Sequence, residues 1–214
     1  MRLKWFGQSC FQLTSSAGTR VLMDPCARWF GYRMPQVEAD AVTTSHTHFD
    51  HNFLQMVEGN FIRINQPGTF QVKDISVHGT QAWHDASQGA KRGRNMIYTY
   101  SVDGLKVCHL GDLGHRLTPE QLADIGKVEV LLLPVGGTFA ITVAWAVEVQ
   151  KQLHPAITIP MHYRTRALGL GGIFFAPVNR FLSLARQPVR KMQELFLQAP
   201  LPADLAEVVL LNYE

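Results

Sequence analysis

The sequence predicts a mixed α/β (α+β) fold in which helices cover two β-sheets. Short strand patterns fill the first half of the chain, and strands alternate with helices in the second half. This order of elements is typical of stacked layers of sheet and helix around a shared core. The 214 residues can bury enough apolar surface to fold without disulfides or a structural metal. Because no linker divides the chain, we expect residues 1–214 to form a single domain.

The first half of the chain is predicted to consist of short strands separated by turns. Gly7 lies in the first turn, and Asp24 with Pro25 ends the third strand. The β-branched strand at 41–45 runs directly into a group of histidines. The predicted strands are 1–5, 10–14, 20–23, 41–45, 61–64, 69–72, 75–78 and 96–102.

The second half is predicted to alternate strands with helices. Thr118 followed by Pro119 is typical of a helix N-cap and first helical residue. The run from 166 to 183 mixes glycines with aromatic residues and fits no period. We expect a buried irregular connection there, and a loop at the mouth of a site is the alternative. The predicted helices are 118–125, 142–153 and 189–197, and the predicted strands are 107–110, 128–133, 156–160 and 208–211.

Charge, cysteine content and hydropathy exclude several classes of protein. The net charge of +3 comes without long basic runs, so neither nucleic acid nor an anionic membrane is an expected partner. The three cysteines are odd in number and form no CxxC pair, which indicates reduced thiols. No apolar stretch is long enough for a membrane span, and the first residues lack the apolar core of a secretory signal. We therefore expect a cytoplasmic protein.

The strongest functional signal is the string SHTHFDH at residues 45–51. On a strand, residues i and i+2 share a face, so His46 and His48 can bind one ion together. If the chain then turns, Asp50 and His51 point towards a second position nearby. Histidine and carboxylate without cysteine favour a catalytic metal site that keeps one position open for water.

The alternative is that these side chains are packed or solvated and bind no ion. A lone histidine on a strand is usually of that kind. Four such groups in one apolar core would each need a hydrogen-bond partner, so we interpret them as ligands. Further ligands are expected at the ends of later strands, where a sheet presents residues to a shared edge. The candidates are His84, Asp112 and His162.

Several short strings accompany this cluster in a fixed order along the chain. They are GQSCF at 7–11, MDP at 23–25, HLGDLGH at 109–115, LPVGG at 133–137 and IPMHY at 159–163. Together with HxHxDH, they resemble the metallo-β-lactamase superfamily over residues 1–165. The similarity is greater to its small metal-dependent hydrolases, the branch that includes the ascorbate-6-phosphate lactonase-like proteins. The resemblance implies a four-layer αβ/βα sandwich of two β-sheets flanked by helices.

The resemblance also implies a site for two divalent metal ions. Zinc is the expected ion, and the mixed nitrogen and oxygen ligands also suit manganese or iron. Asp24 would orient a ligand histidine from behind the metals. Gln8 stands where relatives often have a histidine, at a position that is not a ligand. The implied ligands are His46, His48 and His84 for the first ion, Asp50, His51 and His162 for the second, and Asp112 as the bridge.

The expected chemistry is hydrolysis of a small ester, lactone or similar bond. Two neighbouring ions lower the pKa of a shared water to about 7 and so supply hydroxide. Asp50 would ligate and orient this nucleophile. His115, three residues after Asp112, is the candidate proton donor to the leaving group, and an outer hydrogen-bonding role is the alternative.

Three other functions stay open at this point. The basic residues Lys91, Arg92 and Arg94 could receive a phosphate, which would favour a phosphodiesterase acting on a phosphorylated small molecule or lipid. A solvated turn is the simpler interpretation of such a run. A metal-binding protein without turnover is the second alternative, although two acidic residues, Asp50 and Asp112, argue against it. A redox di-iron protein is the third, but it normally requires a flavin domain.

Overall fold

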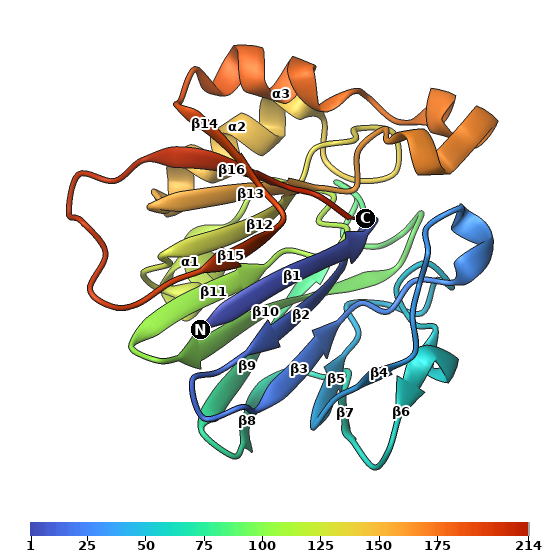
Figure 1. Cartoon of the computed structure of the whole chain (residues 1–214). Coiled ribbons are helices and arrows are strands. Elements are labelled where there is room, and N and C mark those ends of the chain that lie inside the picture. Colours follow the sequence, from blue (N-terminus) through green and yellow to red (C-terminus); the bar gives the residue numbers. More distant parts are fainter. Residues whose placement is uncertain (214) are drawn as a thin grey trace.

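Two large β-sheets pack face to face in the computed structural model, which describes residues 1–213 apart from the side chain of Trp29 (Figure 1). The first sheet has six strands, and its strands come mainly from the first third of the chain. In spatial order they are β15 (Glu194–Phe196), β1 (Arg2–Gly7), β2 (Cys10–Thr14), β3 (Arg20–Met23), β5 (Ala41–Thr43) and β7 (Ile62–Ile64).

The second sheet has eight strands and forms the other half of the sandwich. In spatial order, the strands of the second sheet are β14 (Val189–Met192), β16 (Glu207–Leu211), β13 (Ile157–Met161), β12 (Val130–Pro134), β11 (Leu105–His109), β10 (Arg94–Val102), β9 (Ile75–Trp83) and β8 (Gly68–Val72). A third, separate sheet has only two strands, β4 (Val37–Glu38) and β6 (Val57–Glu58).

The α-helices are α1 (Pro119–Ile125), α2 (Val143–Leu153) and α3 (Val178–Ala185), and the 3₁₀-helices are η1 (Arg28–Phe30), η2 (Leu54–Met56) and η3 (Arg166–Phe174). The α-helices α1 and α2 pack on the second sheet and α3 packs on α2, whereas 3₁₀-helices and loops cover the outer face of the first sheet (Figure 1). Among the described residues, no helix is both long enough and apolar enough to cross a bilayer.

Alternating side chains of the first sheet divide the apolar core into two clusters. Phe11 and Leu13 of β2 point to the cluster between the two large sheets. Cys10, at the start of the same strand, joins a smaller cluster with Leu22 and Met56. Because strand side chains alternate between faces, both faces of this sheet are covered. The outer cover consists mainly of short 3₁₀ turns and loops, not of long helices.

Several predicted elements match the structure to the residue. β2 and β3 have the predicted bounds, and α1 begins at Pro119 as expected. The Thr118 hydroxyl accepts a hydrogen bond from the backbone N–H of Gln121, whose side chain accepts from the backbone N–H of Thr118. This reciprocal pair is a capping box, which explains why local sequence alone determines where the helix starts.

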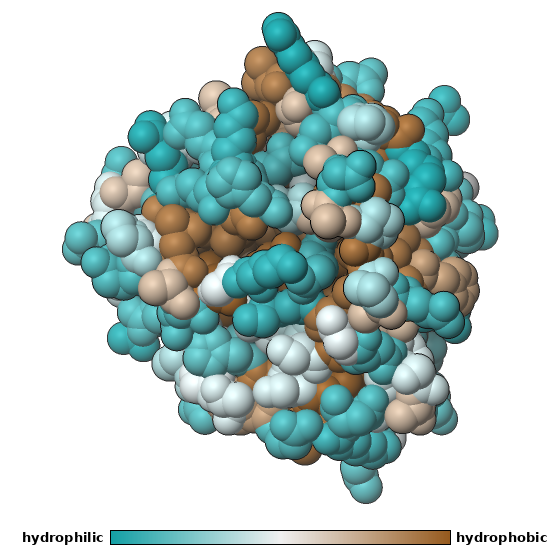
Figure 2. All heavy atoms as spheres, turned by 90° about the vertical axis from the view of Figure 1, so that its left-hand side faces the viewer, coloured by the Kyte–Doolittle hydropathy of each residue, from teal (hydrophilic) through white to brown (hydrophobic). Residues whose placement is uncertain are grey.

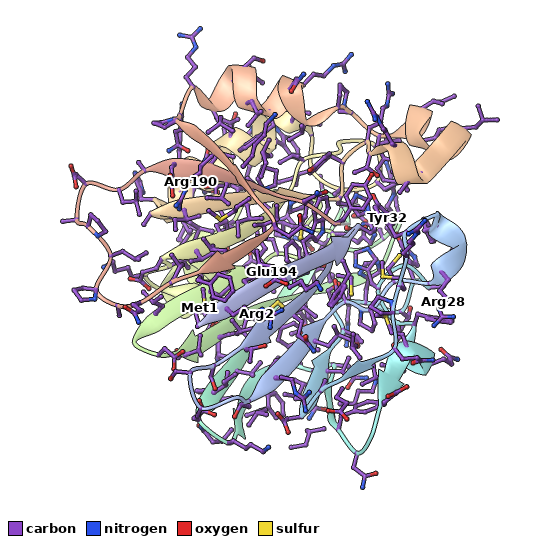
Figure 3. The ribbon with its side chains drawn as sticks, viewed as in Figure 1. Met1, Arg2, Arg28, Tyr32, Arg190 and Glu194 are labelled. Carbon is purple, nitrogen blue, oxygen red and sulfur yellow. The ribbon has the colours of Figure 1, made fainter. Side chains whose placement is uncertain are left out.

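The predicted helix at 189–197 is wrong. The segment forms two strands, with β14 pairing with β16 in the second sheet and β15 pairing antiparallel with β1 in the first. Arg2 of β1 donates two hydrogen bonds to the carboxylate of Glu194 on β15, at 2.7 and 2.8 Å (Figure 3). Pairing with two separate sheets overrides the weak helical pattern of the sequence.

The segment at 166–183 also differs from the expected buried connection. It forms η3 and the start of α3, and several of its apolar side chains are exposed. Leu170 is 91% exposed and Phe174 is 56% exposed. Gly169, at φ 52° and ψ −134°, breaks the 3₁₀ turn, so the segment cannot continue as one helix. The alternative, a loop at the mouth of a site, agrees with this placement.

Candidate metal centre

Strand ends from both large sheets meet at one edge of the sandwich. β3, β5 and β7 run parallel in the first sheet, and β11, β12 and β13 run parallel in the second. The histidine-rich loop follows β5, and His84 directly follows β9. Asp112 lies three residues beyond β11, and His162 directly follows β13. The positions of these last three residues at strand ends are therefore confirmed.

The structure brings together all seven side chains that were predicted as ligands. They form three groups, and within each group the potential ligand atoms lie within 4.8 Å of one another. The first and third groups correspond to the ligand sets implied by the resemblance for two separate ions. The groups are His46, His48 and His84; His46, His51 and Asp112; and Asp50, His51 and His162.

Asp112 lies at the centre of these groups. Its Oδ2 atom is 3.3 Å from Nε2 of His51 and 3.3 Å from Nε2 of His162. The same oxygen is 3.4 Å from Nε2 of His84, which belongs to the other ligand set. A single carboxylate oxygen therefore faces both ligand sets, which is the position that a bridging ligand needs.

The donor atoms of this cluster fit a metal ion. Within the described part of the chain, the buried atoms Nε2 of His51, both ring nitrogens of His162 and Oδ1 of Asp112 have no hydrogen-bond partner. Buried polar atoms without partners are rare because desolvation is costly. Coordination of a divalent cation by nitrogen and carboxylate oxygen would compensate for that cost, and zinc, manganese and iron all accept such ligands.

Asp24 holds a histidine from each ligand set in one tautomer. Its carboxylate accepts a hydrogen bond from Nδ1 of His51 at 2.7 Å and from the Ser45 hydroxyl at 2.5 Å. Nδ1 of His46 in turn lies 2.9 Å from the oxygen of that hydroxyl and donates to it. With both Nδ1 atoms donating, Nε2 of His46 and Nε2 of His51 are left to bind metal. The predicted contact between Asp24 and a cluster histidine is confirmed.

Tight turns at the strand ends direct these side chains into the site. Asp24 and His162 have positive φ values of 43° and 52°, and so does Gly111, at 55°. A Cβ atom on Gly111 would lie 2.4 Å from Oδ1 of Asn95. That oxygen accepts a hydrogen bond from the backbone N–H of Asp112. Only glycine therefore fits at position 111. The conformation of this turn also fixes the position of the Asp112 carboxylate.

Burial and charge shift the pKa values of the cluster in opposite directions. Burial lowers the pKa of His46 to about 3. Burial also acts to lower the pKa of His162, but the carboxylate of Asp112 outweighs it and raises that pKa to about 9. Burial would raise the pKa of Asp112, yet His162 and His51 hold it well below its usual range. The carboxylate is therefore ionised at neutral pH and available to a cation.

Gln8 contacts the cluster in a way that sequence reasoning missed. Its side chain is fully buried, and Nε2 donates a hydrogen bond to Oδ2 of Asp50 at 3.2 Å. Its backbone carbonyl accepts from the backbone N–H of His162 at 3.1 Å. The string GQSCF placed Gln8 in a turn, but no spacing rule indicated that this turn lies against residues 50 and 162.

His115 lies outside the three ligand groups and is not among the described residues that line the adjoining cavity. Its Nε2 accepts a hydrogen bond from the backbone N–H of Trp83 at 3.2 Å, and its Nδ1 donates to the carbonyl of Arg116 at 2.7 Å. Both ring nitrogens therefore bind the backbone. This geometry agrees with the outer hydrogen-bonding alternative and not with proton donation to a substrate.

A cavity of about 770 Å³ opens beside the cluster. His48, Asp50, His84 and Asp112 form its floor, and most of the other lining residues are apolar. The segments that line it lie on the right of the molecule in Figure 1, and Tyr32 marks that side in Figure 3. The opposite face is mainly hydrophilic, with smaller hydrophobic areas (Figure 2).

One residue of the predicted basic loop reaches this cavity. Arg92 lines it, whereas Arg94 lines a neighbouring cavity of about 410 Å³ that borders His46 and His48. The carboxylate of Asp85 shapes the loop by accepting hydrogen bonds from four backbone N–H groups between Ser87 and Arg92, at 2.7 to 3.1 Å. The loop is therefore an ordered turn and not a loose surface run.

Comparison with known proteins decides the family of this chain. Residues 2–162 match the β-lactamase superfamily domain. The chain belongs to this superfamily. The match covers the strands and turns that carry all seven cluster residues, and it confirms the resemblance on which the fold and the ligand sets were predicted.

Individual members of the superfamily extend this result. A metal-dependent hydrolase from Thermoplasma volcanium is 30% identical over 193 residues, which cover 77% of this chain and 84% of that protein. A solved structure from Thermotoga maritima, described as a zinc-dependent hydrolase of the metallo-β-lactamase superfamily, is 36% identical with a TM-score of 0.80. It covers 98% of this chain and 97% of its own. The chain is thus a metal-dependent hydrolase of the metallo-β-lactamase superfamily.

A more distant structure shares the fold alone. The isothiocyanate hydrolase from Delia radicum gut bacteria has a TM-score of 0.69 and 15% identity, over 87% of this chain and 92% of that chain. At this identity the similarity carries no information on substrate.

Proposed function

We propose that this superfamily member is a dinuclear hydrolase that cleaves a small ester, lactone or similar bond. The observation that carries the proposal is the central position of Asp112, whose Oδ2 atom faces both ligand sets at 3.3 to 3.4 Å. One ion would be held by His46, His48 and His84 and the other by Asp50, His51 and His162, with Asp112 between them.

The proposed metals would supply the nucleophile. Two divalent ions bound by these ligands would lower the pKa of water towards neutrality and so supply hydroxide at neutral pH. Zinc is the proposed ion, and manganese or iron would fit the same donors. The cytoplasm is the proposed location, which agrees with three buried cysteines that form no disulfide in the described structure.

The side chains around the metals have separate tasks in this proposal. Asp50 orients the nucleophile, and the amide of Gln8 holds one carboxylate oxygen of Asp50 in place. Asp24 keeps His46 and His51 in the tautomers that leave Nε2 for metal. The apolar walls of the cavity exclude water from the substrate, which strengthens every electrostatic interaction inside it.

Elemental analysis tests the metal centre. Protein purified without chelator is expected to contain about two equivalents of transition metal per chain, and the Asp112→Asn variant to contain fewer. Removal of metal by a chelator should abolish hydrolysis of lactones and carboxylic esters, and reconstitution should restore it. No bound metal after incubation with zinc, manganese or iron would overturn the proposal. Two bound equivalents without hydrolysis of any ester, lactone or phosphodiester would favour a metal-binding protein without turnover.

A phosphodiesterase is the second candidate, because Arg92 lines the cavity next to the proposed metal ligands. The two candidates differ in how they depend on this residue. A phosphodiesterase should hydrolyse bis(4-nitrophenyl) phosphate faster than carboxylic esters and should lose that activity in Arg92→Gln. An esterase or lactonase should show the opposite order of substrates.

A further inference from the structure

The walls of the cavity beside the metal centre are almost entirely apolar. Apart from the floor residues, its described lining consists of six large apolar side chains, one glycine and one arginine. Cavities of this kind bind the hydrocarbon part of a ligand, and a few polar groups fix its orientation. The six apolar side chains are Phe30, Phe49, Phe139, Leu168, Phe174 and Phe175.

Aromatic rings cluster on two sides of this cavity, and they come from distant parts of the sequence. Phe30 of η1 packs against Phe49 of the histidine-rich loop, with ring centroids 5.5 Å apart. On the other side, Phe139 lies 5.4 Å from Phe175 and 6.5 Å from Phe174. Phe49 and Phe174 are each 56% exposed although both are aromatic. Exposed aromatic residues gathered around a concave site indicate a surface that a ligand covers.

The segment that carries part of this wall is held in place by hydrogen bonds. The Arg164 side chain donates to the carbonyl of Gly172 at 2.7 Å and to the carbonyl of Ile173 at 3.0 Å. The backbone N–H of Phe175 donates to the carbonyl of Gly172 at 3.1 Å. The wall is therefore part of the folded structure, and its apolar character belongs to the site itself.

The side chains of the cavity walls carry little positive charge. Arg92 is the one lysine or arginine among the described residues that line it, and its guanidinium lies 5.5 Å from the ring centroid of Phe139. A doubly charged phosphate monoester is usually bound by several cationic or backbone donors. A phosphate monoester therefore has a single cationic partner in these walls, whereas a hydrocarbon group can pack against most of their surface.

We infer that the substrate carries a bulky hydrocarbon group, a medium-length alkyl chain or an aryl ring, on the acyl side of the bond that is cleaved. The inference rests on the proposed hydrolase function and adds the substrate class to it. Water adds its oxygen to the acyl carbon, and the bond from that carbon to the alcohol oxygen breaks. One proton of the water goes to the alcohol, and the other leaves the carboxylic acid as it ionises.

An acyl-chain series with one leaving group tests this inference. Metal-loaded protein is assayed with 4-nitrophenyl acetate and 4-nitrophenyl octanoate, so that the leaving group is the same in both reactions. We expect kcat/KM for the octanoate to exceed that for the acetate by at least about tenfold, because each buried methylene favours binding. Equal values, or a preference for acetate, would overturn the inference and leave the hydrolase function intact.

Two matched variants on the same segment locate the preference. In Phe174→Ser, the octanoate-to-acetate ratio of kcat/KM should fall at least about fivefold, because the wall loses an aromatic ring. Leu170→Ser removes an apolar side chain that is 91% exposed and does not line the cavity, and the ratio should not change. An equal fall in both variants would assign the effect to the fold or to self-association, and would contradict the inference.

A binding measurement separates failure of the inference from failure of the hydrolase function. Titration calorimetry of metal-loaded wild type with sodium octanoate and sodium acetate compares the two acids without any turnover. Tight binding of octanoate by wild type, weakened in Phe174→Ser, would support the apolar cavity even if no ester were hydrolysed. Equally weak binding of both acids would show that the cavity does not bind a hydrocarbon group. That outcome would reject the inference even if the protein hydrolysed other substrates.

Discussion

The floor and the walls of the cavity are built by different physical means. Directly behind the floor, Asp24 and His51 are fully or almost fully buried, and a 2.7 Å hydrogen bond joins them. On the walls, Phe49 and Phe174 are more than half exposed and contact their neighbours mainly through ring packing. A change in the floor therefore disturbs charge and hydrogen bonding for every substrate. A change in the walls alters only how well a particular substrate fits.

Removal of a candidate metal ligand next to the floor should have the largest effect. His51→Ala deletes one candidate ligand from the group of Asp50, His51 and His162, and it removes one of the donors to the carboxylate of Asp24. We expect kcat/KM to fall by more than about 100-fold for all substrates, because loss of an outer hydrogen-bonding partner alone costs about 10- to 100-fold. Metal content should fall with it. His154→Asn, at the end of α2, is the control, and two retained metal equivalents in His51→Ala would contradict the assignment.

A change behind the floor should have the next largest effect. In Asp24→Asn, an amide replaces a carboxylate that accepts hydrogen bonds from Ser45 and His51. The NH₂ group of the amide cannot accept, so at least one of these two donors loses its acceptor. We expect metal affinity to fall about 10- to 100-fold, measured by competition with a chromogenic chelator. Asp204→Asn changes an exposed carboxylate outside the ligand groups and should leave the affinity unchanged. The same loss in both variants would show that Asp24 has no special role.

The contact between Gln8 and Asp50 should have an intermediate effect. Gln8→Met keeps the size of the side chain but removes the donor to Oδ2 of Asp50. A hydrogen bond to a charged group contributes about 1.5–3 kcal/mol, so we expect kcat/KM to fall by about tenfold or more for every ester, with metal content unchanged. Gln12→Met, which removes a donor to the backbone carbonyl of Glu38 on the outer face of the same sheet, is the control. Unchanged kinetics in Gln8→Met would exclude a positioning role.

A conservative change in the wall should have the smallest effect. Phe139→Leu keeps the wall apolar but removes the ring contact with Phe175 and the stacking under Arg92. These interactions contribute about 0.5–1.5 kcal/mol each, so KM for an aryl ester should rise by roughly two- to tenfold while kcat stays constant. Steady-state kinetics with a phenylacetyl ester measure the change. A fall in kcat for all esters would mean that the floor and the walls are not independent.

Local chemistry made much of the floor predictable from sequence. The ligand candidates occur in short strings that mark metal-binding side chains. The strand expected at 41–45 ends at Thr43, however, so His46 and His48 come together in a loop and not on a shared strand face. The strand ends that supply Asp112 and His162 follow apolar runs that are simple to recognise. The contact of Asp24 with a cluster histidine was also predicted. The second contact, in which the Ser45 hydroxyl links Asp24 to Nδ1 of His46 by hydrogen bonds, was not predicted.

The walls could not be predicted in the same way. Phe30, Phe49, Phe139 and Phe174 come from four separate segments, and no spacing relates them. Only the tertiary fold brings them around one cavity. The error at 189–197 has a similar cause, because the two strands of that segment are defined by partners in different sheets and not by their own pattern.

The pairing of β15 with β1 also has a consequence for synthesis on the ribosome. The edge of the first sheet is completed by residues 194–196, which are translated long after β1, β2 and β3. Until then, β1 presents unpaired backbone groups along one side, and an unpaired strand edge can recruit a strand of another chain. The ion pair between Arg2 and Glu194 then forms across the closed edge. The nascent protein therefore has an open sheet edge that closes only after residues 194–196 have left the exit tunnel.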